Sequence, residues 1–194
     1  MPDSAVSFPR RGTPLTRALA HRLLGLGGWR VEGALPDEPR FVLIVAPHTS
    51  NWDFLVGVLA MFAIGLRSSW FGKHTLFRFP AGPILRWLGG EPIDRSTKRG
   101  TVETAVECFR TRSRWVLTLT PEGTRKRAEQ WKTGFHQIAV GAGVPIVPVT
   151  FDYSRKVVGL GAPFRPTGDA VRDISAIRGL FRKEMARYPE LFAE

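Results

Sequence analysis

The chain has 194 residues, of which 43% are hydrophobic and 23% charged. This composition excludes a disordered protein, and the length is enough for one domain with a sizeable core. The formal net charge of +11 predicts a polyanionic partner, which is a nucleic acid, a phosphorylated small molecule or an anionic bilayer. A single cysteine excludes an internal disulfide and a multi-cysteine metal site.

The N-terminal residues 1–14 are polar and contain prolines, which predicts a flexible lead-in without the apolar core of a secretory signal. Residues 15–194 are expected to form a single domain, because no linker or internal repeat divides them. Leucines on one side of residues 15–26, with basic residues elsewhere, predict an amphipathic helix. Such a helix suits a membrane interface and equally suits packing on the domain's own core. No window holds the roughly 20 apolar residues that a spanning helix needs.

Predicted strands and helices alternate along the rest of the chain. Strands are expected at 29–33, 41–45, 68–73, within 89–95, and at 115–120, 144–149 and 157–160. Helices are expected at 54–66, 97–112, 133–140 and 171–188. This alternation predicts an α/β fold with a mixed, mostly parallel central sheet flanked by helices.

Prolines affect the expected structure of two segments, residues 75–88 and the strand at 144–149. Pro80 and Pro83 exclude one long helix over residues 75–88. The aromatic residues beside arginines in that segment suit a membrane interface, or a core element whose arginines reach out to solvent. Two further prolines predict unusual pairing for the strand at 144–149.

The chemistry is expected around His48, which follows the buried strand 41–45, and Asp53, which begins the next helix. Ligands of open α/β sheets bind at such strand ends. An imidazole there can take a proton from a substrate hydroxyl, and a carboxylate on the other ring nitrogen would fix its tautomer. The pair can meet only if His48 lies in the loop and Asp53 in the first helical turn. An alternative is that Ser50 and Asp53 merely cap the helix.

Two loops at strand ends combine glycine with arginine, which is a pattern that suits a phosphate ligand. They are Gly90 to Arg95 and Glu122-Gly123-Thr124-Arg125. Lys73 and Lys132 could add positive charge for the same anion, although each loop alone could also be a turn with a solvated arginine. The histidines have no metal-ligand spacing, and neither a P-loop nor a Gly-x-Ser-x-Gly elbow is present.

Taken in order, four motifs resemble the glycerolipid acyltransferase family of the 1-acylglycerol-3-phosphate acyltransferase type. They are His48 to Asp53, Gly90 to Arg95, Pro121 to Arg125, and Val144 to Val149, and the resemblance covers residues 41–150. The resemblance implies a glycerol-3-phosphate acyltransferase-like fold. It also implies an enzyme that transfers a fatty acyl group from acyl-CoA or acyl carrier protein to a hydroxyl of a lysophospholipid.

The resemblance also implies a role for each motif. His48 and Asp53 would be catalytic, without a cofactor or a metal. Arg95, the Glu122–Gly123–Thr124–Arg125 loop and Lys73 would bind the acceptor and its phosphate, and Val144 to Val149 would serve structure and donor binding.

We therefore expect a cytoplasmic enzyme that works on the inner face of an anionic membrane and has no nucleic-acid partner. Two alternatives from other classes are a basic nucleic-acid-binding module and a non-catalytic lipid-binding protein on the same scaffold.

Overall fold

Seven strands form one sheet in the computed structural model, which describes residues 7–93 and 100–193. The strands are β1 (Arg30–Gly33), β2 (Arg40–Ala46), β3 (Ser69–Lys73), β4 (Gly90–Ile93), β5 (Trp115–Leu119), β6 (Ile146–Asp152) and β7 (Val157–Leu160). Their order across the sheet is β1-β7-β6-β2-β5-β3-β4, and among these pairs only β6 and β7 run antiparallel. The predicted mixed, mostly parallel sheet is confirmed.

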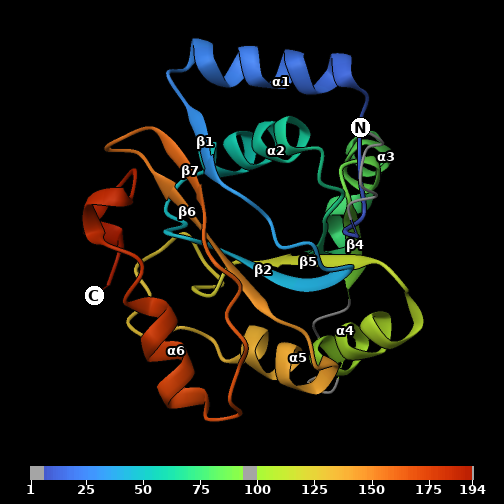
Figure 1. Ribbon diagram of the computed structural model, residues 1–194, viewed down its shortest axis with the longest axis vertical. Helices are drawn as coiled ribbons and strands as arrows, with labels where there is room; N and C mark the ends of the chain where they lie inside the picture. Colours follow the sequence, from blue (N-terminus) through green and yellow to red (C-terminus); the bar gives the residue numbers. More distant parts are fainter. Residues whose placement is uncertain (1–6, 94–99, 194) are drawn as a thin grey trace.

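Helices cover both faces of this sheet. They are α1 (Pro14–Leu26), α2 (Trp52–Ile64), α3 (Ala81–Trp87), α4 (Gly100–Thr111), α5 (Gly134–Ala142) and α6 (Ala170–Arg178). Figure 1 shows α1 and α2 on one face, and α4, α5 and α6 on the other. Short 3-10 turns lie at His74–Phe77 (η1), Lys183–Met185 (η2) and Pro189–Leu191 (η3). None of the helices among the described residues is long and apolar enough to cross a membrane.

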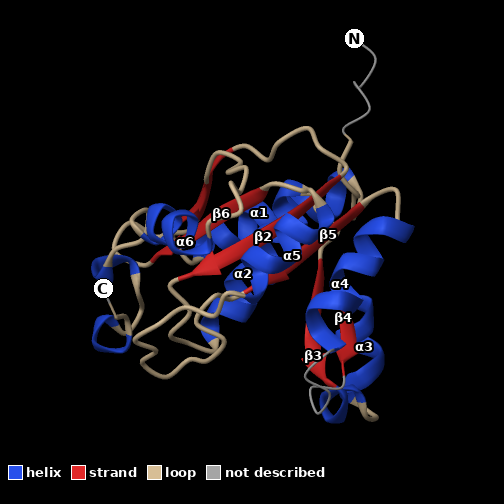
Figure 2. Ribbon diagram, turned by 90° about the horizontal axis from the view of Figure 1, so that it is seen from below, coloured by secondary structure: helices blue, strands red, loops and turns tan. Residues whose placement is uncertain are grey.

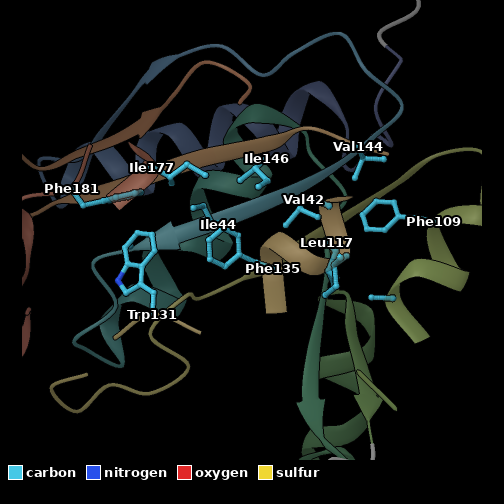
Figure 3. Packing of buried hydrophobic residues seen from close by; sticks show 14 of the residues in the cluster. Val42, Ile44, Phe109, Leu117, Trp131, Phe135, Val144, Ile146, Ile177 and Phe181 are labelled. Carbon is cyan, nitrogen blue, oxygen red and sulfur yellow. The ribbon is translucent and has the colours of Figure 1, made fainter. Parts of the chain in front are cut away.

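The central strand β2 is buried because it lies between β5 and β6 and is covered on both faces. Alternate residues of a strand point to opposite faces, so both faces of β2 must be apolar. Val42 and Ile44 pack with α4, α5 and α6 in one cluster, where Phe135 lies beside Ile44 (Figure 3). Phe41 and Leu43 pack under α2 in another. The continuous apolar run in the sequence therefore has a direct structural cause.

The N-terminal segment is packed against the domain where the structure describes it. Residues 1–6 lie outside the described residues. Phe8 is buried in the cluster under α2, and the Arg11 amide donates a hydrogen bond to the Gly65 carbonyl at 2.8 Å. Gly65 ends α2 with φ +70°, a conformation that glycine adopts at low cost. Residues 7–13 thus differ from the flexible lead-in expected from their polarity.

The prediction of unusual pairing for the proline-containing strand is wrong, because β6 is a central strand paired with β2 and β7. Pro148 lies opposite Ile44 of β2, while the ladder to β7 starts only at Val149. The Ile146 amide faces the β7 side, where it donates to the Phe164 carbonyl, so the donor-less Pro148 nitrogen two residues on faces that side too. The missing donor therefore falls just outside the β7 ladder.

The C-terminal helix is shorter than predicted. The expected helix over 171–188 ends at Arg178, and Gly179 caps it. The chain then continues through η2 and η3, and Phe181 and Phe192 join the core cluster beneath α5 and α6. Because the helix stops early, residues 180–193 return to the edge of the sheet.

Candidate functional site

The site lies at the carboxyl ends of three neighbouring parallel strands, β6, β2 and β5. The loop after β2 carries His48, the loop after β5 carries Glu122, and Tyr153 follows β6. Figure 2 shows loops gathered at the arrowhead of β2, with the C-terminal segment beside them. The parallel topology therefore brings together residues that are far apart in the sequence.

His48 and Asp53 meet as the sequence prediction requires. Nδ1 of His48 lies 3.0 Å from Oδ2 of Asp53, with side-chain exposed fractions of 14% and 1%. The ring nitrogen makes no well-aligned hydrogen bond to any described residue, so this is a contact at hydrogen-bond distance with poor N–H direction. Catalytic hydrogen bonds often become well aligned only when substrate binds. The partly open imidazole and the enclosed carboxylate suit a base and its orienting group.

The N-cap of α2 is Asn51, whose side chain makes no capping hydrogen bond. Asp53 follows in the first turn and contacts both the loop before the helix and His48. Its Oδ2 accepts a hydrogen bond from the Ser50 amide at 2.9 Å, at the start of α2. Its Oδ1 accepts one from the Tyr153 hydroxyl at 2.6 Å. Buried carboxylate oxygens need hydrogen-bond donors, and both oxygens of Asp53 have one. With both oxygens held, the carboxylate has one orientation toward His48.

Tyr153 is the contact that sequence reasoning missed. Burial, followed by the hydrogen bond to Asp53, raises the pKa of Tyr153, so its hydroxyl is a donor throughout the physiological range. Its ring packs edge-on against Trp29 at 4.8 Å between centroids. Tyr153 is 100 positions from Asp53, and no spacing rule connects them. The only available signal was its position four residues after the end of the strand predicted at 144–149.

Glu122 supports the histidine loop from the β5 side. Its Oε1 accepts a hydrogen bond from the His48 amide at 3.1 Å. Its Oε2 is buried and has no hydrogen-bond partner among the described residues. Burial raises the pKa of Glu122, although backbone N–H groups, including that of His48, act in the opposite direction. The partner that the structure provides for this carboxylate is the backbone of His48.

The rest of the predicted phosphate loop forms a tight turn beside Glu122. Gly123 has φ +64°, and a Cβ built there would come within 2.7 Å of the Lys132 side chain. Thr124 Oγ1 accepts a hydrogen bond from the Lys126 amide at 3.1 Å, and Arg125 is exposed. The turn therefore presents glycine, hydroxyl and cations together at one edge of the sheet.

The remaining predicted residues are placed less completely. Lys73 is exposed at the end of β3, the strand next to β5, and so lies at the same edge of the sheet. Arg95 lies outside the described residues. A second buried pair, His136 with Asp173 at 2.8 Å, joins α5 to α6. Within the described residues, no group of three His, Cys, Asp or Glu side chains could hold a metal ion.

The chain is similar to known acyltransferases. A family model described as Acyltransferase matches residues 30–152, a range that includes His48, Asp53 and Glu122. A Haemophilus influenzae protein named 1-acyl-sn-glycerol-3-phosphate acyltransferase is 27% identical, over 89% of this chain and 81% of its own length. The Escherichia coli protein of the same name is 34% identical over 66% of this chain. The match spans about half of that relative, 55% of its length.

A solved structure shares the fold. The crystal structure of the 1-acyl-sn-glycerophosphate acyltransferase PlsC from Thermotoga maritima superimposes with a TM-score of 0.64. The match covers 86% of this chain and 75% of that one, at 18% sequence identity. At this identity the likeness concerns the path of the backbone.

Proposed function

Because the chain belongs to the acyltransferase family of enzymes, we propose that it transfers a fatty acyl group from a thioester to a lysophospholipid hydroxyl. The acceptor that the names of the similar proteins favour is 1-acylglycerol-3-phosphate. The donor that we propose is acyl-CoA or acyl carrier protein. The observation that carries the proposal is the 3.0 Å approach of His48 to a buried, fully held Asp53 at the edge of the sheet.

In this mechanism His48 removes the proton from the acceptor hydroxyl, and the oxygen attacks the thioester carbonyl. Asp53 orients the ring and stabilises the imidazolium that forms. The tetrahedral intermediate then expels the thiolate, which takes the proton back from His48. The balance is one ester and one thiol from one alcohol and one thioester, without an acyl-enzyme or a cofactor.

Acceptor binding is assigned to the cations at the same edge. Arg125 and Lys73 are exposed there, and we add Arg95 on the strength of the motif that it completes. Guanidinium groups match phosphate oxygens and would hold the hydroxyl near His48. Arg125→Ala or Arg95→Ala should raise the KM for lysophosphatidate about tenfold with little change in kcat. The KM for monoacylglycerol, which has no phosphate, should stay as it is.

We also propose that the enzyme works from the cytoplasmic surface of an anionic membrane. Several apolar residues are exposed, namely Leu26 of α1 and Phe79, Ile84 and Trp87 in and before α3. Exposed arginines lie beside the last three of these residues. Phe79→Ser should weaken sedimentation with phosphatidylglycerol vesicles. Val171→Ser, which changes an equally prominent apolar residue on α6, is the matched control and should leave sedimentation unchanged.

The enzyme proposal is tested with purified protein, acyl-CoA and lysophosphatidate by measuring free thiol and identifying the product by mass spectrometry. His48→Ala should abolish turnover while its circular dichroism melting curve stays cooperative. His74→Ala, at an exposed histidine, is the control and should retain turnover. Near-normal turnover by folded His48→Ala would overturn the mechanism.

A further inference from the structure

The segment after α6 fixes an arginine beside the His48–Asp53 pair. The Tyr153 amide donates a hydrogen bond to the Met185 carbonyl at 2.9 Å, and the Tyr188 amide donates one to Thr49 Oγ1 at 3.2 Å. These two contacts hold the short stretch between Met185 and Tyr188 against both the β6 end and the histidine loop. Phe192 and Ala193 are buried, so the segment is anchored beyond this stretch as well.

Arg187, in this held stretch, is surrounded by aromatic rings. Its guanidinium carbon lies 5.5 Å from the ring centroid of Trp52, 5.6 Å from that of Tyr153 and 5.7 Å from that of Tyr188. No carboxylate among the described residues pairs with it, whereas Arg155 and Arg165 pair with glutamates. Aromatic contacts position a guanidinium without neutralising it. A fixed positive charge therefore remains available next to the His48–Asp53 pair.

The surroundings of Arg187 are open to a ligand. Trp52 and Tyr188 are 52% and 41% exposed, and the arginine itself is exposed. A guanidinium presents a planar fork of N–H donors, which matches the oxygens of a phosphate ester. Holding the side chain in advance lowers the entropy that binding an anion would cost. The chemistry therefore points to a phosphate-bearing ligand.

We propose that Arg187, Trp52 and Tyr188 form a phosphate-binding site for a substrate of the reaction. The site lies on the β6 side of His48, through Tyr153, while the Glu122–Arg125 loop lies on the β5 side. If the β5 side takes the acceptor phosphate, the β6 side takes a phosphate of the thioester donor. This assignment of the donor rests on the proposed function, whereas the affinity for phosphate does not.

The kinetic test compares Arg187→Gln with Arg182→Gln, an exposed arginine of the same segment. With acyl-CoA, Arg187→Gln should raise the donor KM about tenfold and leave kcat within about twofold. With the acyl thioester of N-acetylcysteamine, which has no phosphate, its KM should match the wild type. A rise confined to lysophosphatidate, and absent with monoacylglycerol, would keep the phosphate site and assign it to the acceptor headgroup. Unchanged KM for both phosphorylated substrates, or an equal loss with the phosphate-free ones, overturns the proposal.

A binding measurement separates this inference from the enzyme proposal. Calorimetric titration with coenzyme A and with glycerol 3-phosphate needs no turnover. Arg187→Gln should weaken one of these probes about tenfold while its melting temperature stays that of Arg182→Gln. If no acceptor is acylated but this dependence on Arg187 is found, the enzyme proposal fails and the site remains. Equal binding of both probes by both variants rejects the site.

Discussion

The hydrogen bond from Tyr153 to Asp53 should hold the carboxylate in its orientation toward His48. Tyr153→Phe removes the donor to Oδ1 and leaves the Ser50 amide and His48 as the contacts of the buried carboxylate. A hydrogen bond to a charged group contributes about 1.5–3 kcal/mol. Part of this energy orients the carboxylate toward His48 as the imidazolium forms, and each 1.36 kcal/mol lost from the transition state is tenfold in rate. We therefore expect kcat to fall about tenfold.

The loss should appear in kcat with KM unchanged, because a carboxylate that has lost a donor is less well oriented toward the imidazole.

The assay is thiol release measured between pH 5 and 9 for the wild type, Tyr153→Phe and Ser68→Ala. Ser68→Ala removes another buried hydroxyl, one that contacts Val116 and Thr118 of β5. It should lower the melting temperature and leave kcat as in the wild type. A folded Tyr153→Phe variant whose kcat equals that of the wild type across this pH range would refute the role assigned to Tyr153.

Three further predictions concern stability. Burial raises the pKa of Glu122, so its ionised form costs stability as the pH rises above 4.5. Glu122→Gln should therefore melt higher than the wild type at pH 8 and equally at pH 4, and a difference that does not depend on pH would contradict this. Burial acts to raise the pKa of Asp173, but hydrogen bonds from His136 and Thr167 outweigh burial and lower the pKa. The stability that Asp173 contributes is therefore present at pH values above its ordinary pKa of 3.8 and is lost as the pH falls below that value. Asp173→Ala should lower the free energy of unfolding, measured by urea denaturation at pH 7, by about 3–5 kcal/mol. The difference from the wild type should become smaller at acidic pH, and a loss below about 1 kcal/mol at pH 7 would argue against a stabilising role for the His136–Asp173 pair. Gly123→Ala should cost about 1–2 kcal/mol, because φ at this position is +64° and Lys132 crowds the new Cβ. An unchanged melting temperature would mean that the turn relaxes freely.

The sequence alone was enough to predict the sheet and the His48–Asp53 pair. Continuous apolar runs such as 41–45 arise only where both faces of a strand are covered, so the buried strands could be located from composition. The pair is separated by one short loop, and the strand-to-helix transition fixes its geometry locally. The prediction of unusual pairing from Pro148 was wrong, because the effect of a proline depends on whether its nitrogen faces a neighbouring strand that needs a hydrogen-bond donor. The local sequence does not show which side of β6 each neighbouring strand occupies.

Long-range contacts were decided by the tertiary structure. Tyr153 reaches Asp53 only because β6 lies next to β2, and Glu122 reaches the His48 amide only because β5 lies on the other side. Arg187 arrives because α6 stops at Gly179 and the chain folds back. Local patterns record propensity and burial over a few residues, whereas strand order and chain return depend on packing of the whole domain. The His48–Asp53 pair is therefore set by a local strand-to-helix transition, whereas the contacts around it are set by the order of the strands.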